Sequence, residues 1–254
     1  MKVQFASDIH LEFPDNTRWL KENPLEVTGD ILVLSGDMLI FGSDCMETHP
    51  FIDWCSKHYK HTFLVPGNHE YYNGADITNT LNEFEFPIRD NVTYCNNHSV
   101  VVDNVEFFFT TLWTNVTPKS EMLVQRGMTD CYRIQHGHRF LLARDYKKLH
   151  KLCLDWLTKA LAVSTAEKKV VVSHHCPVMA EDPAFAGNGL TEAFIVPLEE
   201  YIENSNIDHW VFGHTHYNGA NGMKVGHTTM HTNQVGYVKD GVCKGFDHAA
   251  AFEV

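Results

Sequence analysis

The segment Thr62-Phe63-Leu64-Val65-Pro66-Gly67-Asn68-His69-Glu70 carries the strongest structural signal of the chain. Its first four residues predict a buried strand, and Asn68, His69 and Glu70 are suited to bind metal. The same arrangement of an apolar run followed by polar residues recurs at Asp8-Ile9-His10, Gly36-Asp37, His174-His175 and Gly213-His214-Thr215-His216. Side chains that follow neighbouring strands at their carboxyl ends meet at one edge of a sheet. The five segments together therefore predict a metal site.

The mixture of ligands indicates two ions. Two divalent ions about 3.5–4 Å apart can clamp the attacking and leaving oxygens of a phosphoryl transfer, but they repel each other unless an anion bridges them. Asp37 is the natural bridge. Magnesium and calcium prefer oxygen ligands, so the histidines at these segments favour a transition metal. We expect two divalent ions, drawn from manganese, iron, nickel and zinc.

The five segments resemble the pattern of the calcineurin-like metallophosphoesterase superfamily, which is D-x-H, G-D, G-N-H-[DE], H and G-H-x-H. All five blocks occur in order between Asp8 and His216. Four longer stretches are similar to a bacterial branch of small phosphoesterases: Pro66–Tyr72, Thr111–Thr114, Met128–Ile134 and Val170–Pro177. The resemblance implies an α/β fold, a four-layer α-β-β-α sandwich in which two mixed sheets pack face to face with helices outside. We expect one domain over residues 1–254.

The resemblance also implies a role for each motif residue. One ion would be held by Asp8, His10, Asp37 and His216, and the second by Asp37, Asn68, His174 and His214. A water or hydroxide between the ions would attack phosphorus in line, because bound metal lowers the pKa of water from about 15.7 toward about 7. His69 would protonate the leaving oxygen as general acid. Since side chains alternate along a strand, only one of His174 and His175 faces the metal, and we choose His174.

The residues after Asp37 depart from the better-known members of the superfamily. Protein Ser/Thr phosphatases have a second Asp three residues after their Gly-Asp and then an Arg-Gly pair, whereas Met38-Leu39-Ile40-Phe41 stands here. The usual carboxylate partner of the catalytic histidine and the arginine that grips phosphate are therefore missing. Asp44 is a candidate to replace the carboxylate. We expect hydrolysis of small phosphodiesters; a phosphomonoesterase or protein phosphatase, a nuclease and a non-catalytic metal-binding protein stay as alternatives.

Residues 113–138 form a long polar stretch that we expect to cover the metal edge as a lid. Its candidates for substrate contacts are Arg126, Arg133, His136 and His138, since arginine pairs with phosphate oxygens in bidentate geometry. In the alternative interpretation, Arg133 forms an internal ion pair with Asp130 and the histidines are merely exposed. His231, Asn233 and Tyr237 are candidates to support the metal ligands.

Composition excludes several partners. With 20 basic and 32 acidic residues the net charge is −12, so most of the surface would repel a long nucleic-acid duplex. The chain runs from Lys2 directly into its first apolar segment, and no apolar run approaches the roughly 18 residues of a membrane helix. Seven cysteines without C-x-x-C spacing favour reduced thiols. We expect a soluble cytoplasmic protein; the physiological substrate, the native metals and the oligomeric state have no sequence signal.

The remaining segments give the expected elements. Apolar residues at spacings of three and four predict one long helix from Leu142 to Ala160. We also expect helices over Glu47–Lys57, Ile77–Phe84 and Thr191–Glu203, a hairpin of Val100–Val102 with Val105–Thr110, and strands over Thr228–Thr232, Val235–Val238 and Ala249–Phe252.

Overall fold

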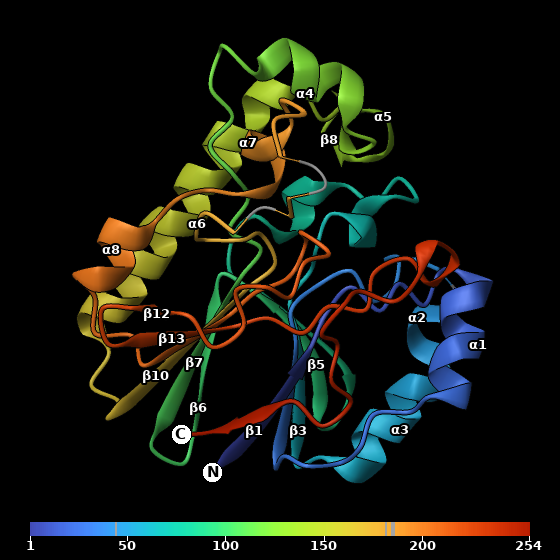
Figure 1. Ribbon diagram of the computed structural model, residues 1–254, viewed down its shortest axis with the longest axis vertical. Helices are drawn as coiled ribbons and strands as arrows, with labels where there is room; N and C mark the ends of the chain where they lie inside the picture. Colours follow the sequence, from blue (N-terminus) through green and yellow to red (C-terminus); the bar gives the residue numbers. More distant parts are fainter. Residues whose placement is uncertain (44, 181, 184–185) are drawn as a thin grey trace.

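The computed structural model describes residues 1–43, 45–180, 182–183 and 186–254 (Figure 1). Two six-stranded sheets lie face to face. The first has the order β14-β1-β2-β3-β5-β4. Its strands are β1 (Lys2–Ala6), β2 (Ile31–Leu34), β3 (His61–Leu64), β4 (Phe84–Arg89), β5 (Val92–Asn96) and β14 (Ala251–Glu253). Strands β1, β2, β3 and β5 are parallel, and the edge strands β14 and β4 are antiparallel to their neighbours.

The second sheet has the order β12-β13-β11-β10-β7-β6. Its strands are β6 (His98–Val102), β7 (Val105–Thr110), β10 (Lys168–Ser173), β11 (His209–Val211), β12 (Lys224–Val225) and β13 (Thr228–His231). Strands β7, β10, β11 and β13 are parallel, and β6 and β12 complete the edges in antiparallel pairing. Both sheets are therefore mixed, as expected.

Alternation of side chains along the strands builds the layers. Phe5 and Val33 of the first sheet and Phe107 of the second belong to one buried cluster, which lies between the sheets. The residues of opposite parity, such as Leu32 and Phe108, join two other clusters on the outer faces. Burial of both faces of each sheet requires a helical layer on each side.

The helices cover these outer faces. Beside the first sheet lie α1 (Pro14–Glu22), α2 (Cys45–Thr48) and α3 (Pro50–His58), and beside the second lie α6 (Ala143–Val163) and α8 (Glu199–Glu203) (Figure 1). The architecture is thus the four-layer α-β-β-α sandwich. Above the sheets, residues 121–140 form what we call the apical segment: α4 (Glu121–Gly127), α5 (Asp130–Arg133) and the small hairpin of β8 (Gln135–His136) and β9 (Arg139–Phe140). It packs against the start of α6 in a separate apolar cluster.

Several expected elements are confirmed and others are wrong. The long helix forms as α6, and the hairpin pairs Val102 with Val105. The helix expected over Glu47–Lys57 is split before Pro50, which begins α3. In Ile77–Phe84 only a 3-10 turn over Ile77–Thr80 forms, because Phe84 begins edge strand β4.

Two corrections lie nearer the carboxyl terminus. The helix expected over Thr191–Glu203 is divided into α7 (Thr191–Phe194) and α8, because Ile195 pairs with Cys176 and Pro197 lacks an N–H. Val235–Val238 is not a strand: Gly236 has φ +74°, and the chain turns into a 3-10 helix over Val238–Asp240. Within the described residues, no helix is long and apolar enough to cross a membrane.

Candidate metal centre

The candidate ligands follow five parallel strands at their carboxyl ends. In chain order, Asp8 and His10 follow β1, Asp37 follows β2, Asn68 follows β3, His174 follows β10, and His214 and His216 follow β11. Both sheets therefore contribute, and the Asp8 carboxylate joins them by accepting the backbone N–H of His214 at 3.1 Å from each oxygen. Three glycines permit this close approach, because an added Cβ at Gly36, Gly67 or Gly213 would lie under 3.0 Å from a ligand side chain.

The backbone of the ligand loops is unusual. Nine described non-glycine residues have a positive φ, and five of them are candidate ligands: Asp8, His10, Asp37, His214 and His216, with φ between 50° and 73°. This left-handed region is costly for residues with a Cβ, and such strain gathers at functional sites. The sharp turns after β1, β2 and β11 thus bring these five side chains to one place.

The first group of side chains consists of Asp8, His10 and His216, whose ligand atoms all lie within 4.8 Å of one another. His10 Nε2 lies 3.1 Å from His216 Nε2, and His216 Nε2 lies 3.4 Å from Asp8 Oδ1. Asp37 Oδ2 borders the group, 3.9 Å from His10 Nε2. Ligands about 2.1 Å from an ion and at right angles are about 3 Å apart, so these spacings suit a shared cation.

The second group consists of Asp37, His174 and His214, with Asn68 beside them. His174 Nε2 lies 3.0 Å from both Asn68 Oδ1 and His214 Nδ1. It also lies 3.5 Å from Asp37 Oδ1. Asp37 thus turns one oxygen toward each group, as a bridging carboxylate would.

In the second group, two hydrogen-bond acceptors face each other without a proton between them, which indicates that the group needs a cation. The carbonyl of Ser35 can only accept, so His174 Nδ1 donates to it at 2.9 Å. Burial lowers the pKa of His174 to about 4, so the ring is neutral and Nε2 is an acceptor. Asn68 Oδ1, 3.0 Å away, is also an acceptor. Two lone pairs at this distance repel unless a positive charge lies between them, and nitrogen with oxygen is a donor set that transition metals accept.

The charges around the site lead to the same requirement. Four carboxylates gather here, from Asp8, Glu12, Asp37 and Glu70, and no described Lys or Arg forms an ion pair with them. Burial, and then the neighbouring Glu70 and Asp8, raise the pKa of Asp37 well above its usual range. An ionised bridge therefore needs positive charge beside it. The residues fit divalent cations in charge and in donor type.

Glu70 organises the two loops that carry Asp37 and Asn68. Its carboxylate accepts the backbone N–H groups of Asp37, Met38 and Gly67 at 2.7–3.1 Å. Burial raises the pKa of Glu70 to about 7, against the lowering effect of these hydrogen bonds. Glu70, the acidic residue of the G-N-H-E block, thus connects the loop after β2 with the loop after β3.

Glu12 supplies the carboxylate partner that the sequence lacks after Asp37. Its Oε1 lies 2.8 Å from His69 Nδ1 and 3.0 Å from His10 Nδ1. Accepting both N–H groups leaves Nε2 of each ring turned toward the site. The sequence interpretation missed Glu12, although it stands only two residues after His10. Asp44, the candidate named there, lies outside the described residues.

Tyr237 and His175 complete the surroundings of the histidines. The Tyr237 hydroxyl lies 3.1 Å from His69 Nε2, and its ring packs on His10 and His216 with centroids 4.7 Å away. His175 does not belong to the group of Asp37, His174 and His214: its Nδ1 bonds the Thr111 carbonyl at 3.0 Å and its ring packs on Trp113. The structure thus places His174, and not His175, among the candidate ligands. Of the other supports expected, His231 pairs with His209 instead, and Asn233 bonds the carbonyls of Phe5 and Asp247.

A cleft of about 940 Å³ opens beside the two groups. Its lining includes Asp37, Asn68 and His69, together with Met128 and Arg133 of the apical segment. Two further lining residues, Lys239 and Lys244, were not named in the sequence interpretation. They belong to a loop after β13 that no local motif marks.

The predicted substrate residues separate in the structure. Arg133 lines the cleft and has no ion-pair partner among the described residues, while Asp130 is buried and bonded elsewhere, so the internal ion pair is wrong. Arg126 and His138 are exposed and do not line the cleft. His136 also lies outside it, with Nδ1 3.4 Å from Asp145 Oδ2.

Three comparisons with known proteins bear on family and fold. A sequence model described as calcineurin-like phosphoesterase matches residues 1–218. A curated relative, the uncharacterized protein L509 of Acanthamoeba polyphaga mimivirus, is 27% identical over 271 residues, which cover 92% of this chain and 91% of the relative. Among solved structures, the phosphopantetheinyl hydrolase (PptH) from Mycobacterium tuberculosis is similar with a TM-score of 0.65 at 14% identity, covering 94% of this chain and 90% of that chain.

A putative 5'-nucleotidase from Staphylococcus aureus is matched over 92% of this chain and 48% of its own length, with a TM-score of 0.45 and 18% identity. The similarity to the mycobacterial hydrolase shows a shared fold. Its sequence identity is too low to transfer a substrate.

Proposed function

Because this chain belongs to the calcineurin-like phosphoesterase family, we propose that it hydrolyses small phosphodiesters with two divalent transition metal ions in the candidate metal centre. Family membership indicates a metal-dependent phosphoric ester hydrolase. The observation that carries the dinuclear assignment is the pair of ligand groups on either side of Asp37, with His10 Nε2 3.9 Å from one carboxylate oxygen and His174 Nε2 3.5 Å from the other.

Each ion would have its own ligands. One ion would be held by Asp8, His10, Asp37 and His216, and the other by Asp37, Asn68, His174 and His214. Bound there, such ions supply Lewis-acid stabilisation to the phosphoryl oxygens and lower the pKa of the attacking water. Four imidazoles in the two sets favour manganese, iron, nickel or zinc over magnesium.

His69 is the proposed general acid. Glu12 holds its Nδ1–H, so Nε2 faces the cleft, 4.0 Å from Asp37 Oδ2. From this place Nε2 would give its proton to the leaving oxygen of a phosphoester bound at Asp37. The Tyr237 hydroxyl, 3.1 Å from the same nitrogen, would be a neighbouring donor for a phosphoryl oxygen.

The proposed preference for diesters rests on the volume of the cleft and on the absence of an arginine after Asp37. A volume of about 940 Å³ is large enough to hold organic groups on both sides of phosphorus. No arginine follows Asp37 to grip a dianionic phosphate. Arg133 and Lys239 on the walls would instead meet distant polar or anionic parts of the substrate.

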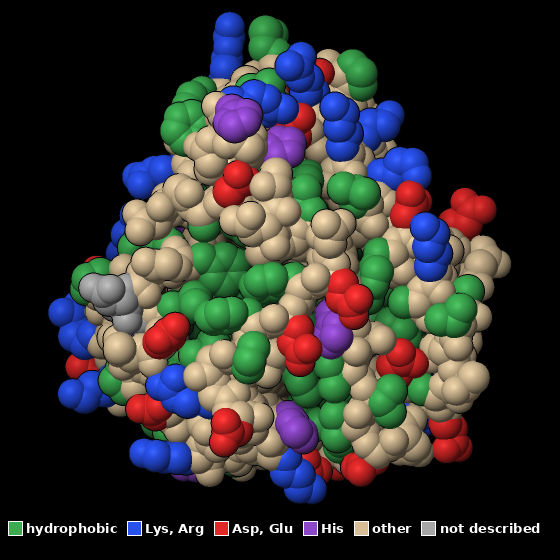
Figure 2. All heavy atoms as spheres, turned by 180° about the vertical axis from the view of Figure 1, so that it is seen from behind, with side chains coloured by type: hydrophobic (Ala, Val, Ile, Leu, Met, Phe, Trp, Pro, Cys, Tyr) green, Lys and Arg blue, Asp and Glu red, His purple; other side chains and the backbone are tan. Residues whose placement is uncertain are grey.

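The charge distribution bears on substrate size. Lys and Arg side chains gather at the apex on the face shown in Figure 2. Residues 117–151 hold eight basic and three acidic residues, in a chain whose net charge is −12. Of these basic residues Arg133 lines the cleft, together with Lys239 and Lys244. These three side chains favour anionic ligands, so short oligonucleotides belong in the substrate screen. Exclusion of a long duplex, a cytoplasmic location, a single domain over 1–254 and a lid over 113–138 stay predictions.

The test compares bis-nitrophenyl phosphate with mononitrophenyl phosphate. Metal-stripped protein is resupplied separately with manganese, nickel, zinc and magnesium, with Asp37→Asn in parallel. We expect metal-dependent turnover, faster for the diester, and a kcat at least about 1,000-fold lower in Asp37→Asn, about 4 kcal/mol of barrier. Asp145→Asn is the matched control, because that buried carboxylate bonds Arg139 outside the cleft.

Other outcomes discriminate between the alternatives. Faster turnover of the monoester would favour a phosphomonoesterase or protein phosphatase. Binding of two ions per chain without turnover of either ester would favour a non-catalytic metal-binding protein. Turnover that is equal in Asp37→Asn would remove the bridging role of Asp37.

A further inference from the structure

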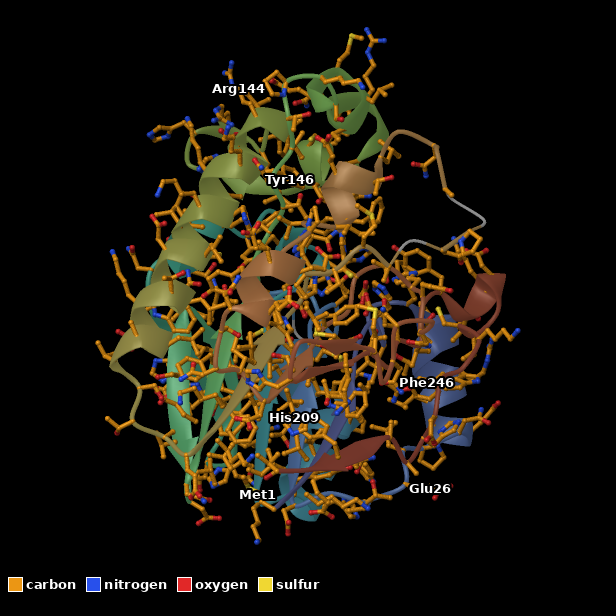
Figure 3. All side chains as sticks on the ribbon, turned by 60° about the vertical axis from the view of Figure 1, so that its left-hand side comes forward. Met1, Glu26, Arg144, Tyr146, His209 and Phe246 are labelled. Atoms are coloured by element: carbon orange, nitrogen blue, oxygen red, sulfur yellow. The ribbon has the colours of Figure 1, made fainter. Side chains whose placement is uncertain are left out.

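Asp130 lies in the Met128–Ile134 stretch, which the metal motifs do not explain. It begins α5 and is fully buried. Its Oδ2 accepts the hydroxyl of Tyr146, which α6 presents toward the apical segment (Figure 3). Its Oδ1 accepts the hydroxyl of Tyr72 at 2.5 Å. A buried carboxylate is costly unless donors surround it, so this network holds α5 and α6 beside the loop that follows β3.

The third donor to Asp130 is a candidate metal ligand. Asn68 Nδ2 donates to Asp130 Oδ1 at 2.9 Å and to the Tyr72 oxygen at 2.9 Å. Both acceptors therefore lie on the NH₂ side of the amide group. The amide oxygen is then turned the other way, 3.0 Å from His174 Nε2. If the amide rotated by half a turn, its NH₂ would face the site where a cation needs an oxygen.

We propose that Asp130 is a positioning residue that fixes the Asn68 amide so that its oxygen faces the metal held by His174 and His214. The inference rests on the proposed function, since it assumes an ion at that place. Partners that orient metal ligands typically contribute about 10–100-fold to metal affinity or activity. A residue of the apical segment would thus orient a metal ligand that follows β3. Asp130 makes this contact with Asn68 and does not form the ion pair with Arg133 considered from the sequence.

Only one of the two ions should depend on Asp130. Asn68 belongs to the group on the His174 side of Asp37, and no described contact links Asp130 to Asp8, His10 or His216. A general loss of stability would weaken both ions together. Selective loss of one ion therefore distinguishes positioning from a merely structural role.

The test is a manganese titration of metal-free protein by calorimetry, with bound metal counted by elemental analysis. We expect wild type to bind two ions, and Asp130→Ala to bind one ion with wild-type affinity and the other about 10–100-fold more weakly. Asn68→Ala should weaken the same ion. The double variant should bind metal no more weakly than Asn68→Ala alone, because Asp130 acts through Asn68.

Two controls keep the test decisive. Asp145→Asn changes another buried carboxylate, in the first turn of α6, that bonds Arg139 and not Asn68, and this variant should bind both ions normally. If Asp130→Ala does not fold by circular dichroism, Tyr72→Phe removes one acceptor of the Asn68 amide and should weaken the same ion by a smaller factor.

Unchanged affinity in the Asp130→Ala and Tyr72→Phe variants, equal weakening of both ions, or additive losses in the double variant would overturn the inference while leaving the proposed function intact. Wild type that binds fewer than two ions would overturn the proposed function, and this inference with it.

Discussion

A single oxygen atom of Glu12 bonds both a candidate metal ligand and the proposed general acid. Its Oε1 accepts from both His10, a candidate ligand, and His69, the proposed acid, while Oε2 is buried without a hydrogen-bond partner among the described residues. The hydrogen bonds with these two histidines lower the pKa of Glu12 to about 2, although burial opposes the shift. The group is therefore a carboxylate at neutral pH and can hold both rings.

Changing Glu12 should affect the leaving-group step. We expect Glu12→Gln to lower kcat about 10–100-fold, because it removes the negative charge beside both imidazole rings and buries an NH₂ group where Oε2 has no hydrogen-bond partner in the described part of the chain. The loss should be larger for an alkyl ester than for a nitrophenyl ester, whose good leaving group needs little protonation. His69→Ala should show the same dependence on leaving group. The measurement is kcat for both ester types, with exposed His138→Ala as control; equal losses for both esters would remove His69 and Glu12 from the acid step.

The positions of the candidate ligands could be predicted from sequence, whereas among their neighbours Tyr237 was named only as one candidate of three and Glu12 was missed. Asp8, His10 and Asp37 stand at fixed spacings after apolar runs, so local pattern is enough to bring them to one edge. Glu12 carries a local signal in D-x-H-x-E, but its hydrogen bond to His69 joins residues that are 57 positions apart. Tyr237 is further still, 168 positions from His69, and depends on how the loop after β13 returns.

The turn after β2 should affect both the stability of the fold and the position of a candidate ligand. Gly36 lies two residues after β2 with φ +95°, and an added Cβ would lie 2.2 Å from His174 Nδ1. We expect Gly36→Ala to destabilise the fold by about 1–3 kcal/mol and to lower metal binding, because backbone strain and the clash displace His174. Urea unfolding and manganese titration measure the two effects.

Gly137 provides the matched comparison for Gly36. It also has a left-handed φ, of +64°, but no atom lies within 4 Å of an added Cβ. Gly137→Ala should therefore cost only about 1 kcal/mol and leave metal binding unchanged. If both variants bind metal normally, the close approach at Gly36 has no role in holding His174.

At the level of helices and strands, sequence periodicity predicted helices correctly where one face of the helix is buried. It failed where a residue of the expected helix pairs with a distant segment instead. Helix α6 has a continuous apolar face and formed as expected. The stretch from Thr191 has helical propensity, but Ile195 pairs with Cys176 next to the histidine loop, which ends α7 early. The helix expected over Ile77–Phe84 ran into the first residue of β4, because an edge strand that is only half buried lacks a strong strand signal.

Over the whole molecule, the two sheets also meet at a histidine pair formed by the first residue of β11 and the last residue of β13. His209 Nδ1 of β11 lies 3.0 Å from His231 Nε2 of β13. Phe252 of β14, in the other sheet, stacks on both rings with centroids 4.4 and 4.1 Å away. His209 lies between the strands of the two sheets in Figure 3. Burial, with a smaller effect of His209, lowers the pKa of His231 to about 3.

This pair should make the metal-free protein sensitive to acid. The pKa of His231 is about 6.5 when unfolded and about 3 when folded, so between these values only the unfolded chain binds the proton. Stability is therefore complete above pH 6.5 and falls as pH falls toward 3. By about pH 5 the loss from this group is about 2 kcal/mol. Between about pH 8 and pH 5, we expect the free energy of unfolding of His231→Gln to fall by about 2 kcal/mol less than that of wild type. Urea unfolding with a chelator present measures this difference. Exposed His138→Gln should behave as wild type; an identical loss in His231→Gln would show that acid acts through the buried metal-site histidines instead.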